Sequence, residues 1–452
     1  MRMFKLIFLS LLMLFLFNVG YGQTKADNYN IHFSKMNQSD NVIHVKCEFD
    51  LIIERQSSET YEINMRFGGQ LKENAVKDLQ VNSVPELEYD FNAEKREITF
   101  YPKKRTIDTA HITMNYNYLN FSTTFNYRGG AEFWETSYQE FYYPHIFGQK
   151  SNFSIKISVP DTISVLANYS LEETSVNDSA KMYCFSTEAP VVSHSVLFGL
   201  LPDNSYHKRS DSLNNFEFQY YLLKSPEIPK KRLDELNDLT IASINYFSDV
   251  FEEGYSNTLT GEDLTYAFHT CDYSNRNDGS FIIASQKKVA TKPHLLPMVH
   301  EIGHRWIGEW TLLIENGQPA AYFIKESLNE YLTILFAKDY YGEAYFDSLY
   351  QKEYVSEYNK ISSTSKDTSL YSMTYNNNNT VVYKKGVIII HKIVDIMGED
   401  QWLDFMKTFY STYKYEPELT YSDFLSLLRK YDVNAAERLD ELVRSKGDIT
   451  EL

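Results

Sequence analysis

Hydrophobic and polar residues alternate along most of the first half of the chain. Between residues 28 and 205, the stretches 41–55, 60–67, 111–121 and 152–159 carry β-branched and aromatic side chains at alternate positions or in short apolar runs. This spacing is typical of strands that bury one face of a sheet. Turn-rich segments separate the stretches, and no helical pattern of convincing length interrupts them. The pattern predicts an all-β domain, either a sandwich or a large curved sheet.

The periodicity changes after about residue 208. One further strand is predicted at 216–225, and residues 226–252 then carry apolar side chains at helical spacing. Short strands follow at 264–270 and 279–285. From there the pattern is mainly helical, interrupted by polar stretches that we interpret as loops. Those stretches are 315–319, 362–369 and the asparagine run 376–379.

These patterns predict an α+β protein with two domains. The N-terminal β domain is expected at 23–208, and the mixed domain, mainly helical toward its C-terminal side, at 209–452. Residues 1–22 combine two basic side chains with the apolar run 6–17, which is typical of a signal peptide. The run is shorter than the roughly 20 residues that span a bilayer. We therefore predict an exported protein, periplasmic or extracellular, without stable membrane insertion; an uncleaved anchor is the alternative.

Charge and cysteine content limit the classes of partner. The formal net charge is −17 at pH 7, which disfavours nucleic acids and anionic membranes because both are bound by clustered Lys and Arg. Cys47, Cys184 and Cys271 are odd in number and far apart, so they do not form a disulfide framework. Buried free thiols are the preferred interpretation, and a single disulfide is the alternative.

The sequence His-Glu-Ile-Gly-His at 300–304 has the spacing of a zinc site. Residues four apart share one face of a helix, so His300 and His304 can direct both imidazoles at one cation. Glu301 lies to the side, where it can reach a water molecule but not the ion. Catalytic zinc takes three protein ligands and keeps a fourth position for water. The alternative is a buried helix that carries two histidines by chance, so the motif needs a third ligand downstream.

A glutamate on a second predicted helix supplies that ligand. Glu309 and Glu315 follow His304 too closely to fold back onto the same ion. Glu326 stands at the start of the next apolar helix, within reach of the first helix. Glu330, one turn later, is suited to accept the second ring N–H of a ligand histidine. For Glu330, an ordinary solvated or salt-bridged surface position is an equally open alternative.

The two segments together resemble the membrane alanyl aminopeptidase (aminopeptidase N) family of gluzincin zinc metallopeptidases. That family has H-E-x-x-H-x-W-x-G followed by a glutamate that opens an E-G-x-x-x-Y-like helix, and six residues here fall on its positions: His300, Glu301, His304, Trp306, Gly308 and Glu326. The likeness extends through the β-type segments and so covers nearly the whole mature chain. It implies a thermolysin-like catalytic domain with one zinc ion per chain.

A third segment adds to the resemblance. The sequence VVYKKG at 381–386 resembles the family's Y-x-K-G segment, whose tyrosine polarises the substrate carbonyl, and Tyr383 takes that place. The resemblance alone suggests this role, because without it Tyr383 is one of 36 tyrosines ahead of an apolar helix.

The chain departs from the family in three respects. The spacing between His304 and Glu326 is 21 residues where 18 is usual, which a loop near 315–321 can absorb. The G-x-M-E-N strand is missing, and residues 277–285 stand in its place with no glutamate. In the family that glutamate holds the α-amine of the substrate. The chain also ends about 70 residues after Tyr383, so we expect the C-terminal helical domain of longer members to be missing.

These observations predict an exported zinc metallopeptidase, aminopeptidase-like, acting on peptides or proteins. In this interpretation Glu301 is the general base and Tyr383 stabilises the oxyanion. An edge strand is expected to pair with the extended substrate; its residues are Phe281, Ile282, Ile283, Ala284 and Ser285. One alternative is a zinc endopeptidase with little need for a free N-terminus. The other is a binding protein with a catalytically silent zinc domain, which the intact Glu301 disfavours because structural zinc needs no general base.

Overall fold

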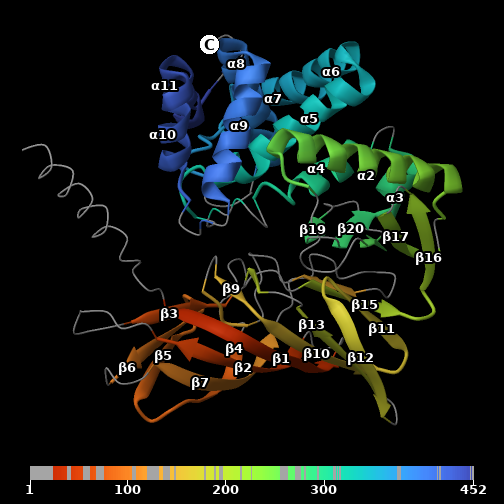
Figure 1. Ribbon diagram of the computed structural model, residues 1–452, viewed down its shortest axis with the longest axis vertical. Helices are drawn as coiled ribbons and strands as arrows, with labels where there is room; N and C mark the ends of the chain where they lie inside the picture. Colours follow the sequence, from red (N-terminus) through yellow and green to blue (C-terminus); the bar gives the residue numbers. More distant parts are fainter. Residues whose placement is uncertain are drawn as a thin grey trace, which may run out of the picture.

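The chain folds into two stacked domains, a β domain and a mixed domain that carries all the helices described below (Figure 1). The predicted fold class is confirmed. The computed structural model describes residues 24–449 apart from 38–41, 54–61, 68–75, 104–107, 120–131, 136–142, 147–148, 178–179, 188–189, 193–196, 214–215, 225–226, 255–262, 270–275, 279–280, 293–294, 309–311, 313, 315–316, 374–377, 415, 417–418 and 448.

A seven-stranded sheet is the base of the β domain. Its order is β12-β13-β10-β1-β2-β7-β4, with β1 and β10 parallel and the other neighbours antiparallel. Along β2, alternate side chains are buried, as the period of two predicts. The strands are β1 (Lys25–Asn37), β2 (Val42–Ile52), β4 (Val76–Asn82), β7 (Thr109–Leu119), β10 (Phe153–Pro160), β12 (Ser170–Asn177) and β13 (Ala180–Ser186).

Smaller sheets cover one face of this large sheet and close the core. Ile98 of β6 and Phe198 of β15 are buried in the same cluster as Phe49 of β2, which makes the domain a sandwich. The sheets are β3-β6-β5, β11-β15-β8 and β14-β9. The strands are β3 (Ile63–Arg66), β5 (Leu87–Asn92), β6 (Glu97–Pro102), β8 (Glu132–Glu135), β9 (Lys150–Ser151), β11 (Ile163–Ala167), β14 (Val191–Val192) and β15 (Leu197–Pro202).

Two cysteines lie in this domain as buried free thiols. Cys47 of β2 and Cys184 of β13 form no disulfide, as the preferred interpretation of the sequence predicts. Cys271 lies outside the described residues.

The mixed domain begins with a five-stranded sheet of order β16-β17-β18-β20-β19. β17, β18 and β20 run parallel, and β16 and β19 are antiparallel strands at the two edges. The predicted domain boundary at 208 falls inside β16. The strands are β16 (Tyr206–Leu213), β17 (Phe216–Leu223), β18 (Asp263–His269), β19 (Arg276–Asp278) and β20 (Phe281–Ser285).

The prediction that residues 281–285 form an edge strand is wrong. β20 pairs with β18 over its whole length, and β19 covers its other side at Phe281, Ile282 and Ile283. All five side chains of β20, including Ala284 and Ser285, are buried. The three-residue β19 precedes β20 in the chain and has no pattern of its own in the sequence, so β20 is taken for the edge that β19 forms. The backbone of Phe281–Ile283 has no free side for a substrate.

The two faces of this sheet pack against different partners. Ile282 and Ala284 of β20 join the core formed with the helices. Phe281 and Ile283 point the other way and cluster with Leu201 of β15 at the boundary with the β domain. The sheet is therefore buried on both faces, which explains the nearly continuous apolar sequence of its inner strands.

Helices cover the face of the sheet opposite the β domain (Figure 1). The predicted helix in 226–252 is confirmed, and among the described residues no helix is long and apolar enough to cross a membrane. Among the described residues, three helical segments contain a π turn, an element that is rare overall but occurs often at functional sites. The helices are α2 (Lys230–Phe251), α3 (Gln286–Thr291), α4 (Leu296–Gly303), α5 (Leu328–Tyr341), α6 (Glu343–Leu349), α7 (Ser356–Asn359), α8 (Gly386–Met397), α9 (Glu399–Tyr413), α10 (Tyr421–Tyr431) and α11 (Val433–Arg444), with π turns η1 (Phe323–Ser327), η2 (Tyr350–Val355) and η3 (Thr380–Lys385).

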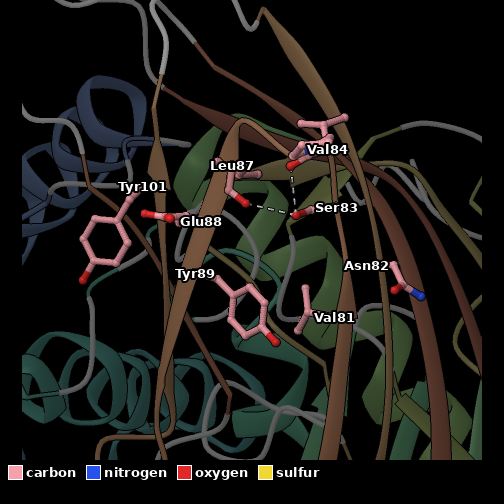
Figure 2. A pocket seen from close by; sticks show the side chains of 9 residues that line it. Val81, Asn82, Ser83, Val84, Leu87, Glu88, Tyr89 and Tyr101 are labelled. Atoms are coloured by element: carbon pink, nitrogen blue, oxygen red, sulfur yellow. Dashed lines mark hydrogen bonds between the residues drawn. The ribbon is translucent and has the colours of Figure 1, made fainter.

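An open hollow lies in the β domain at the corner where β4 leads into β5 (Figure 2). Its volume is about 560 Å³, and the Ser83 hydroxyl fixes the corner by donating to the carbonyl of Leu87 at 3.1 Å. Glu88 is the charged residue among the nine that line it. The hollow belongs to a different domain from the predicted zinc site and takes no part in that site. The lining residues are Val81, Asn82, Ser83, Val84, Pro85, Leu87, Glu88, Tyr89 and Tyr101.

Candidate active site

The two motif histidines lie at the C-terminal end of α4. The helix ends at Gly303, and His304 is its C-cap with φ −60° and ψ −15°, still in the helical region. His304 therefore keeps the helical position relative to His300 although the helix does not continue beyond it. The ring centroids of the two histidines are 4.7 Å apart. The shared face that the spacing predicts is present at the last turn of the helix.

Close contact with α5 holds this turn in place. A Cβ at Gly303 would collide with the side chain of Asn329, so the glycine allows α4 and α5 to approach each other. The Asn329 amide donates to the backbone carbonyl of His300 at 2.7 Å. Nearby, Trp306 stacks on Phe247 of α2 and donates its indole N–H to the carbonyl of Glu253 at 3.1 Å. The motif helix is thus fixed on two sides by buried residues.

Glu326 comes to the histidines from η1, the π turn that precedes α5. Its Oε2 lies 3.3 Å from Nε2 of His300 and 3.5 Å from Nε2 of His304. Donor atoms held about 2.0–2.2 Å from a tetrahedral zinc ion are about 3.3–3.6 Å apart. The three side chains are buried, and their ligand atoms all lie within 4.8 Å of one another. The donor set and its spacing therefore fit one zinc ion, with Glu326 as the third ligand.

The outer ring nitrogens orient both histidines for metal binding. His304 donates from Nδ1 to the backbone carbonyl of Ile307 at 3.0 Å. Nδ1 of His300 lies 2.9 Å from Oε2 of Glu330. Each contact occupies Nδ1 and leaves Nε2 for a metal ion, and such outer partners fix ligand orientation in metal sites. Glu330 thus lies behind His300, as in the first of the two alternatives that the sequence leaves open for it.

Glu330 is itself held by groups that the sequence analysis did not identify. The Tyr354 hydroxyl donates to its Oε1 at 2.7 Å, and Nζ of Lys384 lies 4.2 Å from the centre of the Tyr354 ring. Burial raises the pKa of Glu330, but His300, Lys384 and Tyr354 together lower the pKa to about 2. The carboxylate stays ionised at neutral pH. Tyr354 stands in η2 with no neighbouring motif, so no pattern in the sequence could have identified it.

Tyr383 lies on η3, the π turn before α8, and reaches the same site. Its hydroxyl donates to Oε2 of Glu326 at 2.9 Å. Burial, and after it the Glu326 carboxylate, raises the pKa of Tyr383 well above its usual value, so the hydroxyl keeps its proton. The Ser327 hydroxyl donates to the carbonyl of Val382 at 2.7 Å, and a Cβ at Gly386 would collide with Ser327. The turns that carry Glu326 and Tyr383 are therefore in direct contact.

Glu301 completes the group from within α4. It is 9% exposed and is among the carboxylates that raise the pKa of Tyr383, so the two side chains lie close enough to interact. Of the predicted site residues, His300, Glu301, His304, Glu326, Glu330 and Tyr383 thus come together, whereas β20 lies within the sheet with its backbone paired. Glu309 and Glu315 lie outside the described residues.

The gluzincin class of zinc metallopeptidases is defined by two histidines and a distant glutamate around one ion, with a further glutamate directly after the first histidine. His300, His304, Glu326 and Glu301 have this arrangement. Comparison with known sequences agrees, because residues 283–445 match the peptidase family M1 domain. A search among curated proteins found no match. Residues 283–445 therefore form a peptidase family M1 domain, and the site they carry is that of a zinc metallopeptidase, with His300, His304 and Glu326 fitted to one zinc ion.

Solved structures share the whole two-domain fold. The M1 zinc metallopeptidase of Deinococcus radiodurans is 13% identical, with a TM-score of 0.68 and coverage of 94% of both chains. A glutamate-to-alanine variant of the Deinococcus radiodurans enzyme, bound to a Tyr-Ser-Ala substrate, is 13% identical, with a TM-score of 0.69 and coverage of 94% of this chain and 95% of that one. A two-domain M1 enzyme bound to L-tryptophan is 14% identical, with a TM-score of 0.69 and coverage of 94% and 96%. At these identities the likeness establishes the fold.

Proposed function

We propose that this M1 metallopeptidase is an exported, aminopeptidase-like hydrolase of peptides. One observation carries the proposal: the Tyr383 hydroxyl lies 2.9 Å from the same Glu326 oxygen that converges with His300 and His304. A hydroxyl group beside the three zinc ligands can donate a hydrogen bond to the carbonyl oxygen of a substrate, which gains negative charge during attack. The Tyr-Ser-Ala substrate bound by the similar Deinococcus radiodurans enzyme supports short peptides as the substrate class.

Each residue has a separate role in this proposal. His300, His304 and Glu326 would hold the zinc ion, which would supply Lewis acidity and would lower the pKa of a water molecule at the site. Glu301 accepts a proton from the attacking water and then delivers it to the nitrogen of the leaving amine. Tyr383 donates its O–H to the carbonyl oxygen as negative charge develops. Glu330 keeps the His300 ring in its orientation.

Tyr383→Phe is expected to lower kcat about a hundredfold or more, as the loss of one oxyanion donor does elsewhere. KM should barely change because the hydroxyl acts mainly in the transition state. Steady-state kinetics on one peptide, with zinc content measured on the same sample, test this. A variant with wild-type kcat and stoichiometric zinc would leave Tyr383 as a packing residue.

Preference for a free N-terminus is expected to be weaker than is usual in the family. An ammonium group that leaves water needs a nearby carboxylate, and no glutamate stands between Glu262 and Glu301 in the sequence. The two other carboxylates at the site, Glu326 and Glu330, already contact His300. Matched peptides with free and acetylated N-termini measure the preference. A ratio of kcat/KM above about a thousandfold, or roughly 4 kcal/mol, would show that another acidic group binds the amine.

The export proposal is supported by the basic and apolar segment at the start of the chain, which lies outside the described residues. Mass spectrometry of the protein isolated from its native source should find a mature N-terminus at Gln23. Recovery of the intact N-terminal segment from the cytoplasm would overturn export.

A further inference from the structure

A buried ion pair lies directly behind the turn that carries Tyr383. Lys385, two residues further along η3, has no exposed surface, and its Nζ lies 3.1 and 3.0 Å from the two carboxylate oxygens of Asp367. The same Nζ donates to the carbonyls of Thr368 at 3.3 Å and Ser445 at 2.9 Å. The ammonium group is therefore surrounded by four acceptor oxygens, all supplied by segments other than η3.

Asp367 is shared with the segment that follows α11. The backbone N–H of Gly447 donates to its carboxylate, and the Tyr358 hydroxyl lies 3.4 Å from the same oxygen. That hydroxyl also donates to the carbonyl of Gly447 at 2.7 Å. Asp367 comes from the polar stretch 362–369, which the sequence presents as an ordinary loop. In the structure its carboxylate joins η3 to residues 445–447.

The residues after Asp367 also reach the turn that carries Glu326. The carbonyl of Tyr371 accepts the N–H of Ala320, which lies three residues before η1, at 3.0 Å. The N–H of Tyr371 donates to the carbonyl of Val443 at 3.1 Å. Residues 367–371 thus contact the start of the Glu326 segment at one end and η3 at the other.

Stability alone gives little reason for such a pair. Removing two charges from water costs about as much as their attraction returns, and apolar residues of similar size are often as stable. The pair instead fixes position, because four acceptor oxygens in two segments, 367–368 and the residues after α11, determine where Nζ lies. Tyr383 lies two residues before Lys385 in the same π turn. A π turn is a rare geometry and needs support from its surroundings.

We infer that Lys385 and Asp367 are positioning residues for Tyr383: their ion pair holds η3 against residues 367–371 and 445–447, so that the tyrosine hydroxyl stays beside the zinc site. This inference rests on the proposed role of Tyr383. It assigns a function in catalysis to the polar stretch 362–369 and to the residues that follow α11.

The test is a double-mutant cycle between the ion pair and Tyr383. Lys385→Met and Asp367→Asn are combined so that neither charge is left unpaired in the core. We expect the combined variant to bind zinc stoichiometrically, to lose about tenfold in kcat, and to change KM less than about twofold. In a Tyr383→Phe background the same two changes should lower kcat less than about twofold, because no hydroxyl remains to be positioned.

Three outcomes overturn the inference. In the first, the combined variant retains wild-type kcat. In the second, the two changes lower kcat by the same factor whether Tyr or Phe stands at 383, as a general loss of stability would. In the third, Tyr383→Phe has no effect on kcat, and this result overturns the proposed function as well. The first two outcomes leave the proposed function intact. Lys338→Met with Glu399→Gln removes another ion pair of the same domain, 2.7 Å long, and should leave kcat unchanged.

Hydrogen exchange supplies a measurement that does not depend on activity. In the combined variant, amides of η3 should exchange faster while those of η2, which carries no such pair, remain as in the wild type. Unchanged exchange in η3 would contradict the inference. If the combined variant does not fold, Tyr358→Phe removes only the hydroxyl that joins Gly447 and Asp367. Its smaller loss of kcat should likewise disappear when Phe stands at 383, and an equal loss there would overturn the inference.

Discussion

Glu301→Gln is expected to abolish nearly all peptide hydrolysis while zinc remains bound. Glutamine has the same shape but cannot accept a proton, and general-base catalysis contributes typically about 10²–10⁴-fold. The metal should stay because the three ligands are His300, His304 and Glu326. Metal analysis and kcat measured on the same preparation test both halves of this prediction. A glutamine variant with more than about a tenth of the wild-type rate would exclude Glu301 as the general base.

Glu326→Ala is expected to remove both zinc and activity. The carboxylate is the one acidic member of the ligand set, and without it two buried histidines remain, one ligand short of a catalytic zinc site. His300→Ala and His304→Ala should act in the same way. Zinc bound per chain after dialysis against a weak chelator is the measurement.

Glu330→Gln is the matched control for the Glu326 variant. It removes a neighbouring buried carboxylate that contacts His300 without belonging to the ligand set. Its zinc affinity should fall by only about 10–100-fold, the usual effect of losing an outer partner. If Glu326→Ala retained stoichiometric zinc and Glu330→Gln lost it, the roles of the two glutamates would be reversed.

The sequence predicted the parts of the fold that depend on local periodicity. β2 alternates buried and open positions, and α2 buries Leu233, Leu236 and Phe247 on one side. The zinc ligands could be predicted because His300 and His304 share a helical face and Glu326 opens the next helix. In each case spacing along one segment contains the necessary information.

Features that depend on contacts between distant segments could not be predicted in this way. β20 was assigned to the sheet edge because β19 is three residues long and has no pattern of its own. Tyr354 and Asp367 acquire their positions only when α6–α7 and the residues after α11 fold onto the zinc helices. Tyr383 was found through resemblance to a family, because its own surroundings in the sequence indicate only an apolar helix.

Titration of the metal-free protein with zinc tests the central claim most directly. Hydrolysis of an unblocked peptide should be absent without metal, rise in proportion to added zinc, and level off at one ion per chain, while the Glu326→Ala protein stays inactive throughout. Hydrolysis that persists without metal, or that fails to appear at one zinc ion per chain, would contradict the assignment of His300, His304 and Glu326 to a catalytic zinc site.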